Sequence, residues 1–224
     1  MDYRHEWKHP LNYGDFLALR SRLRSALPHD SHVGVDGSYR IRSLYFDTPG
    51  DRALREKLDG VNCREKFRIR LYNGNADLIR LEKKSRRDSL GSKAAACLTR
   101  EEAQAIVDGD LDWMACHREA LVRELHDRML YSRLMPKTIV DYRREPFVFA
   151  PGDVRVTLDW DLRTGIRRTD FLNTTCPTIP AGEPVYLLEV KYGRFLPELI
   201  RDLVQLESRS AAAFSKYARS RIYG

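Results

Sequence analysis

The chain contains 224 residues, of which 42% are hydrophobic and 32% charged, so it can bury a core beneath a charged surface. Its 8 Phe, 11 Tyr and 3 Trp exclude a wholly disordered chain. No apolar run approaches the ~20 residues that a membrane-spanning helix needs, and the first residues lack the apolar segment of a signal peptide. Four well-separated cysteines without a C-x-x-C pair favour reduced thiols. These features predict a cytoplasmic protein with one domain over residues 1–224.

The formal net charge of +7 is confined to the first part of the chain. Residues 1–93 contain 20 Lys and Arg against 13 Asp and Glu, whereas residues 94–224 contain 19 of each. This asymmetry predicts an anionic partner that binds mainly through the first part of the chain. Charge alone does not distinguish nucleic acid, phospholipid and small phosphates.

Hydrophobic periodicity predicts a mixed order of strands and helices. In the first half we expect a strand over Tyr3–Lys8, a helix capped by Asn12 that ends before Pro28, a strand over Tyr39–Asp47, a helix over Arg52–Leu58, and a hairpin of strands over Glu65–Tyr72 and Leu78–Arg86. In the second half we expect a helix after a capping box at Thr99 and Glu102, a helix within Cys116–Leu134, strands over Lys137–Phe149, Val154–Leu162 and Val185–Tyr192, a helix over Pro197–Ser208 and a short C-terminal helix. The fold class is therefore α+β, with antiparallel strands around a helical insertion.

Alternation along the strands gathers charged side chains on shared faces. In one strand Lys66, Arg68 and Arg70 point together, away from an apolar face. The other shared faces carry Glu6 and Lys8; Arg80, Glu82 and Lys84; Tyr142 and Arg144; Arg155, Thr157 and Asp159; and Glu189 and Lys191. For a single strand, a solvated outer face is the simpler explanation. Because cations recur on five or six strands, that explanation weakens.

Closure of these strands into an antiparallel β-barrel or tunnel with peripheral helices would turn the charged faces inward. Buried cations without partners are costly, so such a centre predicts an anionic ligand with several phosphates in a row. The carboxylates Glu6, Glu82, Asp159 and Glu189 would partly neutralise the cations or hold a divalent ion. Mg²⁺ or Mn²⁺ suits such oxygen ligands, although Asp159 is as readily explained by a structural salt bridge.

A series of short motifs runs through the chain in a characteristic order. The motifs are Arg4-His5-Glu6-Trp7-Lys8, Ser43-Leu44-Tyr45-Phe46-Asp47, Phe67-Arg68-Ile69-Arg70-Leu71-Tyr72, Leu81-Glu82-Lys83-Lys84, Tyr142-Arg143-Arg144-Glu145-Pro146-Phe147, Val154-Arg155-Val156-Thr157-Leu158-Asp159, Leu188-Glu189-Val190-Lys191 and Phe214-Ser215-Lys216-Tyr217. In order and spacing the series resembles the VTC domain, the polyphosphate polymerase domain of the vacuolar transporter chaperone proteins, within the triphosphate tunnel metalloenzyme superfamily. The resemblance implies an antiparallel β-tunnel that binds a triphosphate and a divalent metal.

The resemblance also implies roles for individual residues. Phosphate contacts are implied for Lys8, Lys57, Arg68, Arg70, Lys84, Lys93, Arg144 and Arg155, and the strand faces add Lys66 and Lys191. Tyr142 would hydrogen-bond phosphate, Glu189 would hold Mn²⁺ or Mg²⁺, and Ser215 and Lys216 would close the phosphate site. The residues expected to carry catalysis are Arg68, Arg70, Lys216 and Glu189. Of these candidates, Lys57 and Lys93 lie outside the predicted strands.

The implied activity is transfer of the terminal phosphate of ATP to a growing polyphosphate chain, with release of ADP. A triphosphatase or tripolyphosphate hydrolase of the same fold, in which Glu6 could orient the attacking water, and a non-catalytic polyphosphate-binding module are the alternatives. Nucleic-acid binding ranks last, because Tyr39, Tyr45 and Tyr72 suit a core as well as a stacking platform.

The chain departs from the family pattern in three respects. Arg4 stands where the superfamily start motif usually has a Glu, as in the polymerase branch. Ala213 stands where the family polymerase has a Lys, which thins the cations at one mouth of the expected tunnel. We also expect no SPX-like sensor domain and no membrane segment in this chain, so coupled translocation would need a membrane or regulatory partner.

Overall fold

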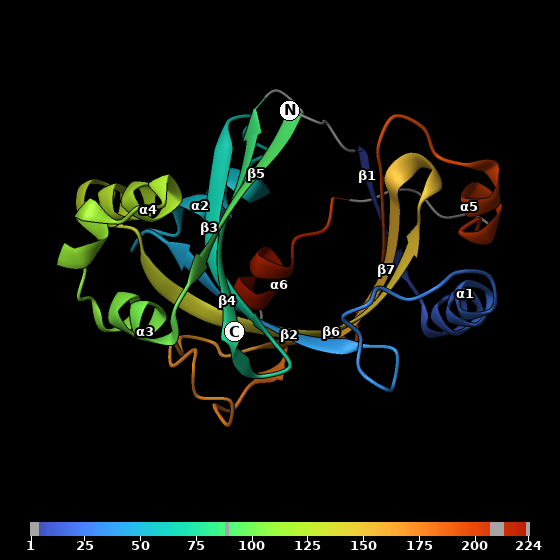
Figure 1. Ribbon diagram of the computed structural model, residues 1–224, viewed down its shortest axis with the longest axis horizontal. Coiled ribbons are helices and arrows are strands. Elements are labelled where there is room, and N and C mark those ends of the chain that lie inside the picture. The colour runs from blue at the N-terminus through green and yellow to red at the C-terminus, as the bar shows by residue number, and fades with distance from the viewer. Residues whose placement is uncertain (1–4, 88–89, 207–212, 223–224) are drawn as a thin grey trace. The chain divides into compact units, whose positions relative to one another are not determined.

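The computed structural model describes residues 5–87, 90–206 and 213–222 (Figure 1). Its strands are β1 (His5–Leu11), β2 (Tyr39–Asp47), β3 (Arg64–Tyr72), β4 (Asn75–Arg87), β5 (Leu90–Leu98), β6 (Met135–Phe149), β7 (Val154–Thr164), β8 (Ile179–Pro180) and β9 (Tyr186–Tyr192). Its helices are α1 (Tyr13–Ala26), α2 (Arg52–Leu58), α3 (Arg100–Asp108), α4 (Ala120–Tyr131), α5 (Glu198–Leu203) and α6 (Lys216–Ile222), with 3-10 turns η1 (Asp112–Cys116) and η2 (Pro151–Asp153). The predicted α+β class, with antiparallel strands and peripheral helices, is confirmed.

The chain divides into two compact units, each built from three segments of the sequence. The first unit comprises Met1–Arg40, Tyr142–Leu162 and Glu183–Ser215, and the second comprises Ile41–Asp141, Arg163–Gly182 and Lys216–Gly224. In the first unit the strand order is β1-β9-β7-β6, and in the second it is β6-β2-β3-β4-β5, with β8 beside β7. The prediction of one domain over residues 1–224 stays a prediction.

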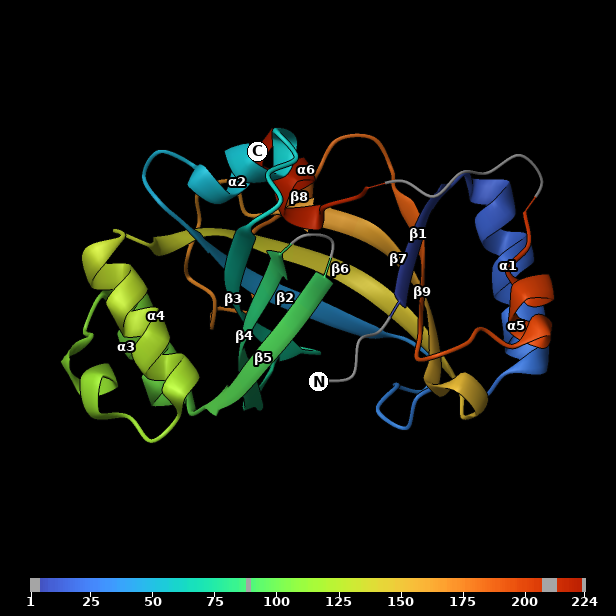
Figure 2. The same ribbon diagram turned by 90° about the horizontal axis from the view of Figure 1, so that it is seen from above.

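The first unit buries the apolar faces of β7 and β9 beneath helices. From α1, Phe16, Leu19 and Leu23 are buried in one cluster with Val156 of β7 and Val190 of β9. Helix α5 adds to this cluster and lies alongside α1 (Figure 2). Asn12 caps α1 as predicted, because its Oδ1 accepts a hydrogen bond of 2.7 Å from the backbone of Asp15. Because side chains alternate along a strand, the charged residues of β7 and β9 occupy the opposite face.

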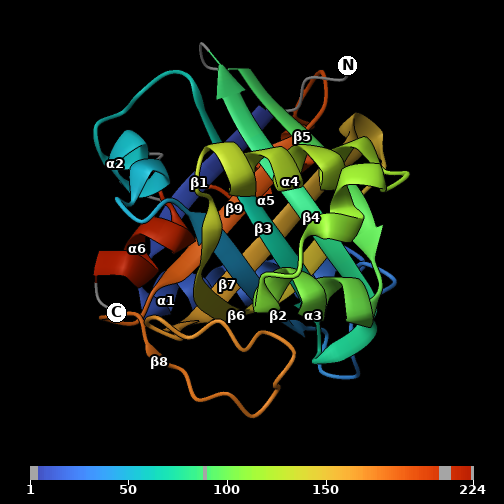
Figure 3. The same ribbon diagram turned by 90° about the vertical axis from the view of Figure 1, so that its left-hand side faces the viewer.

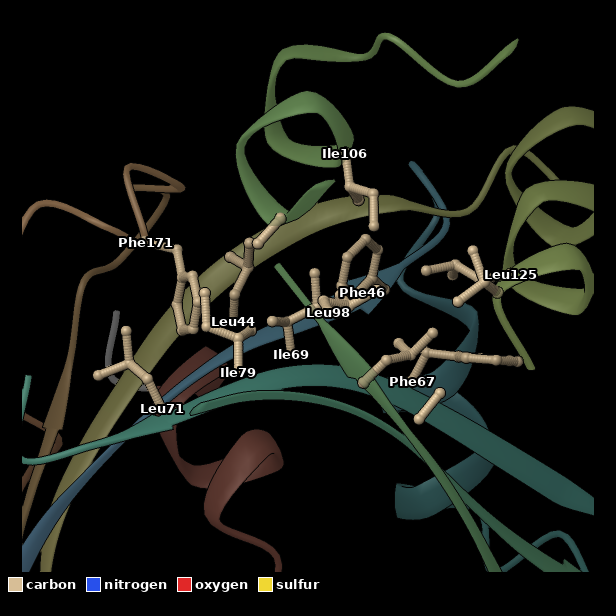
Figure 4. Close-up of a cluster of buried hydrophobic side chains, with 14 of the residues drawn as sticks. Leu44, Phe46, Phe67, Ile69, Leu71, Ile79, Leu98, Ile106, Leu125 and Phe171 are labelled. Atoms are coloured by element: carbon tan, nitrogen blue, oxygen red, sulfur yellow. The ribbon is translucent and has the colours of Figure 1, made fainter. Parts of the chain in front are cut away.

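The second unit has a larger core, on the side of the β3–β5 sheet that α3 and α4 cover (Figure 3). Phe67, Ile69 and Leu71 of β3 pack there with Ile106 of α3 and Leu125 of α4 (Figure 4). Alternation therefore directs the intervening cations of β3 away from this core, as the sequence predicts. The capping box at the start of α3 is also confirmed: the Glu102 backbone donates to Thr99, and the Thr99 backbone donates to the Glu102 carboxylate.

Three element predictions were wrong in detail. Strand β5 was missed, since its run of Ala with Gly91 has low β-propensity; pairing with β4 holds it instead. The helix expected within Cys116–Leu134 is shorter, because η1 ends at Cys116 and α4 runs only over Ala120–Tyr131. Helix α5 ends at Leu203, and the remainder of the predicted segment includes residues outside the described ranges. No helix in the described ranges combines the length and apolar character needed to cross a membrane.

Candidate functional site

Five of the cations predicted to contact phosphate share one face of the β3–β5 sheet, and we call these five the cation face. They are Lys66, Arg68, Arg70, Lys84 and Lys93. Residues directly opposite in an antiparallel pair lie on the same face, and the register pairs Lys66 with Lys84 and Lys84 with Lys93. Lys93 therefore lies in a strand and on this face, which corrects its expected place outside the strands.

Glu82 is the one carboxylate among these cations on β3–β5, and it lies opposite Arg68. Its side chain is 3% exposed; Arg68 Nη2 lies 2.7 Å from Oε2, and Lys93 Nζ lies 2.5 Å from Oε1. Arg70 Nη1 is farther, at 3.7 Å. Burial alone would raise the pKa of Glu82, but the charges of Arg68, Arg70 and Lys93 outweigh it and hold the pKa well below its usual range. One ionised carboxylate thus organises three of the five cations.

Tyr45 of β2 is a buried neighbour of the cation face that the sequence did not single out as a phosphate-site residue. Its hydroxyl accepts a hydrogen bond of 2.9 Å from Arg68 Nη1, and its ring stacks on Tyr217 at a centroid distance of 5.1 Å. Burial favours the neutral phenol, but the charges of Arg68 and Arg70 prevail and lower the pKa of Tyr45 to about 8. The sequence did contain a signal, because Tyr45 alternates with apolar residues in the same way as the cations.

Lys66 is a partly buried lysine of the cation face. Burial lowers the pKa of Lys66 to about 8; Tyr45 opposes this shift, and the smaller repulsions of Lys57 and Arg64 add to it. Its ammonium nitrogen lies 5.2 Å from the ring centroid of Tyr217. The charge of Lys57, from α2, therefore acts on the cation face, while its contact with phosphate stays a prediction.

Asp47 anchors the two helices that carry Lys57 and Lys216. The Tyr217 hydroxyl of α6 donates a hydrogen bond of 2.6 Å to Asp47 Oδ2. The backbones of Ala53 and Leu54 in α2 donate to the same carboxylate at 2.8 and 3.1 Å. With the Thr48 backbone, four donors satisfy this buried carboxylate, so it fixes α2 and α6 beside the end of β2.

The first unit carries a second charged face, which we call the carboxylate face. It consists of Glu6, Asp159 and Glu189 with Lys8, Arg144 and Lys191. Arg144 holds both oxygens of Asp159, with Nε at 2.6 Å and Nη2 at 2.7 Å, and its Nη2 lies 3.1 Å from Glu189. This bidentate pair is almost fully buried, a geometry that favours strong charge-assisted hydrogen bonds.

Two lysines link the remaining carboxylates of this face. Lys8 Nζ lies 3.7 Å from Glu6 and 3.6 Å from Glu189. Lys191 Nζ lies 3.5 Å from Glu6 and 3.9 Å from Glu189. The register explains these contacts, because Lys8 is opposite Glu189 and Glu6 is opposite Lys191. The carboxylate face is therefore closely balanced in charge.

Arg155 and Thr157 of β7 point to the same side as Asp159. Arg155 Nη2 donates to Asp30 at 2.8 Å and to the Tyr39 hydroxyl at 3.0 Å. Its Nε and the Thr157 hydroxyl oxygen are buried, and no described residue gives either a hydrogen-bond partner. Buried polar atoms of this kind need a partner, and an anion or water would supply one.

The carboxylates differ in how well they suit a divalent ion. Among the described residues, no three His, Cys, Asp or Glu side chains form a cluster that could hold a metal. Mg²⁺ usually takes only one or two carboxylates and completes its shell with water and substrate phosphates. Glu6 and Glu189 come nearest to that role, since both lie within 3.5–3.9 Å of the same two lysines and are therefore close to each other. Asp159 and Glu82 fit it less well, because arginines already occupy their oxygens at 2.6–2.7 Å.

The predicted site residues fall into one group per unit. The second unit contains Lys57, Lys66, Arg68, Arg70, Glu82, Lys84, Lys93 and Lys216. The first contains Glu6, Lys8, Tyr142, Arg144, Arg155, Asp159, Glu189, Lys191 and Ser215. Arg4 lies outside the described residues. The roles of these residues, and the binding of one ligand by both groups, stay predictions.

Comparisons with known proteins agree with the motifs. A family model described as the VTC domain matches residues 3–222. The fold is similar to that of a proposed adenylate cyclase from Bacillus halodurans, with a TM-score of 0.54 and 16% identity over 91% of this chain and 86% of that one. A protein from Pyrococcus horikoshii gives a TM-score of 0.48 and 12% identity, over 93% of this chain and 92% of that one. No curated protein matches the sequence. The predicted family and tunnel-type fold class are thereby confirmed.

Proposed function

The chain belongs to the VTC domain family, and from this premise we propose that it transfers the terminal phosphate of ATP to a growing polyphosphate chain. The observation that supports this proposal is the charge balance of the cation face, where five cations share one side of the sheet with the single carboxylate Glu82. A linear polyanion would supply the missing negative charge. Its phosphate oxygens would also accept hydrogen bonds from the guanidinium groups of Arg68 and Arg70.

The proposed reaction is an in-line phosphoryl transfer. A terminal oxygen of the acceptor chain attacks the γ-phosphorus of ATP, the bond from that phosphorus to the β,γ-bridging oxygen breaks, and ADP leaves. The acceptor chain is then one phosphate longer. Little covalent chemistry is required from the protein, so its contribution is to position the reactants and to stabilise charge. In this proposal Arg68, Arg70 and Lys216 orient the phosphates and stabilise the charge that develops on their oxygens.

A divalent ion, Mn²⁺ or Mg²⁺, would neutralise further charge on the phosphate oxygens when bound. We assign its binding to Glu189, with Glu6 as the second carboxylate, because these two side chains share their lysine neighbours. Lys8, Arg144 and Lys191 would keep Glu189 ionised and oriented. Ligand binding beside Thr157 and Arg155 would also provide partners for their unsatisfied buried atoms.

The test is to incubate the purified protein with ATP and Mn²⁺ or Mg²⁺, and to resolve the phosphate products by length while ADP is quantified. Arg68→Ala and Glu189→Gln are the test variants, and Arg87→Gln is the control, because Arg87 alternates with the cations of β4. We expect polyphosphate and a matching amount of ADP from the wild type and the control. We expect losses of about 100-fold or more in the test variants, which remove groups that stabilise the transition state.

Other products would assign another activity. Free phosphate without chains would identify a triphosphatase or tripolyphosphate hydrolase. Tripolyphosphate binding that requires Arg68, without turnover, would identify a binding module. Absence of any phosphate binding would overturn the proposal together with both alternatives.

A further inference from the structure

The row of cations on β3 and β4 continues beyond the residues assigned so far. Arg64 alternates with Lys66 along β3, and the register places it directly opposite Arg86 of β4. At the other end of the row, Arg70 is opposite Arg80. The cation face is thus part of a longer row of opposed cations, whose last pair, or rung, is Arg64–Arg86.

The contacts of this rung leave its charge uncompensated. Arg64 Nη1 donates a hydrogen bond of 2.6 Å to the backbone carbonyl of Val61, and neither arginine forms an ion pair with a carboxylate in the described part of the chain. Burial and the repulsion of Arg86 lower the pKa of Arg64, against a weaker opposite effect of Glu56. Arg64 in turn lowers the pKa of Lys66. The rung is therefore electrostatically continuous with the cation face.

We propose that Arg64 and Arg86 form a further anion-binding subsite, which extends the cation face to a linear polyanion longer than a triphosphate. This inference rests on the proposed function, because it names the length of chain that the same face accepts. Like charges directly opposite each other destabilise a β-sheet, and a bound polyanion offsets that repulsion at every rung.

The length of β3 explains why a long polyphosphate would reach the Arg64–Arg86 pair and a triphosphate would not. Arg64 and Arg70 are six residues apart, which corresponds to about 20 Å along an extended strand. A triphosphate contains only two bridging oxygens, so it spans a fraction of this distance. A triphosphate held at Arg68 and Arg70 would leave Arg64 and Arg86 without phosphate, whereas a longer chain would reach them.

The test compares the Arg64→Gln/Arg86→Gln double variant with wild type and with Arg87→Gln. Arg87 follows Arg86 in β4 and is exposed, but alternation directs it to the other face, so this control removes a neighbouring charge without touching the rung. Two probes are titrated by calorimetry: tripolyphosphate and long-chain polyphosphate of tens of phosphates. Thermal unfolding checks that each variant is folded.

We expect the double variant to bind tripolyphosphate as the wild type does and to bind long-chain polyphosphate about tenfold more weakly. The slope of log affinity against log salt for the long chain should fall by about one to two units, since two phosphate contacts are lost. Arg87→Gln should change neither affinity by more than about twofold.

Three results would contradict either the subsite or the proposed function. Equal long-chain affinity in wild type and double variant, with tripolyphosphate still bound, would overturn the subsite and leave the proposed function intact. An equal loss for both probes would also overturn it, because the rung would then not discriminate length. Failure of the wild type to bind either probe would instead overturn the proposed function.

Discussion

The two charged faces are built in the same way but differ in their charge balance. Each is the polar side of antiparallel strands whose other side is buried in an apolar core. The carboxylate face sets Lys8, Arg144 and Lys191 against Glu6, Asp159 and Glu189. The cation face sets Lys66, Arg68, Arg70, Lys84 and Lys93 against Glu82. The first is nearly neutral without a ligand, whereas the second has an excess of positive charge.

This difference predicts opposite consequences when a cation is removed. On a balanced face, loss of one cation leaves a buried carboxylate without its partner, and the cost appears in folding. On a face with excess cations, the same loss relieves repulsion, and the cost appears in ligand binding. Stability measurements and binding measurements should therefore separate the two faces.

The largest expected effect is that of Arg144→Gln on stability. Arg144 holds both oxygens of buried Asp159 and also contacts Glu189, so its loss leaves two carboxylates that burial disfavours. We expect a decrease of about 3–5 kcal/mol in the free energy of unfolding, measured in urea. The matched variant is Arg70→Gln on the cation face, which should change stability by less than about 1 kcal/mol, because Arg68 and Lys93 still pair with Glu82.

The same two variants should also be compared in their affinity for tripolyphosphate. Arg70→Gln should weaken tripolyphosphate binding by about tenfold or more, through loss of a charge-assisted contact. A large loss of stability in Arg70→Gln, together with a stable Arg144→Gln, would contradict the distinction between the two faces.

Strand alternation was sufficient to predict that cations gather on β3 and β4, because one face of each strand is apolar. It could not predict which carboxylate pairs with which cation, since the contact between Arg144 and Asp159 depends on the register of separate strands. Lys93 was assigned only through the resemblance, because β5 is Ala-rich and is held by pairing rather than by its own propensity. Tyr45 alternates with apolar residues as the cations do, but it was missed as a site residue because β2 is buried along almost its whole length, so a tyrosine there suits the core equally well.

The next largest effect concerns Glu82, the single carboxylate of the cation face. Glu82→Gln removes the counter-charge of Arg68, Arg70 and Lys93, and we expect a loss of about 2–3 kcal/mol in the free energy of unfolding. Because a ligand that binds the folded state stabilises it, saturating tripolyphosphate should raise the melting temperature of Glu82→Gln by more than that of the wild type.

Glu189→Gln is the comparison for this experiment, because Glu189 belongs to the balanced face. Tripolyphosphate should restore less of the stability of Glu189→Gln, since the cations that lose Glu189 still face Glu6 and Asp159. Equal recovery in both variants would show that the cation face has no greater need for an anion than the carboxylate face.

The smallest expected effect is a decrease in phosphate affinity at alkaline pH that arises on the cation face alone. Lys66 and Tyr45 both have a pKa of about 8. Above this pH Lys66 loses its positive charge and Tyr45 gains a negative one, so the face becomes less positive by about 1.6 charges between pH 7 and pH 9. Tripolyphosphate affinity should decrease by about tenfold over this range, as expected when binding favours the protonated form of each group by about one pKa unit or less.

The ligand and the surrounding residues do not produce this decrease by themselves. Tripolyphosphate becomes more negative as pH rises, which would strengthen its binding, and arginine side chains as a class stay protonated in this range. Lys66→Arg retains a charge that does not titrate in this range, and Tyr45→Phe removes the phenol. The double variant should therefore bind tripolyphosphate with little change between pH 7 and pH 9. A decrease as large as that of the wild type would assign the pH dependence to groups elsewhere in the protein, and would remove the burial of Lys66 among cations as its cause.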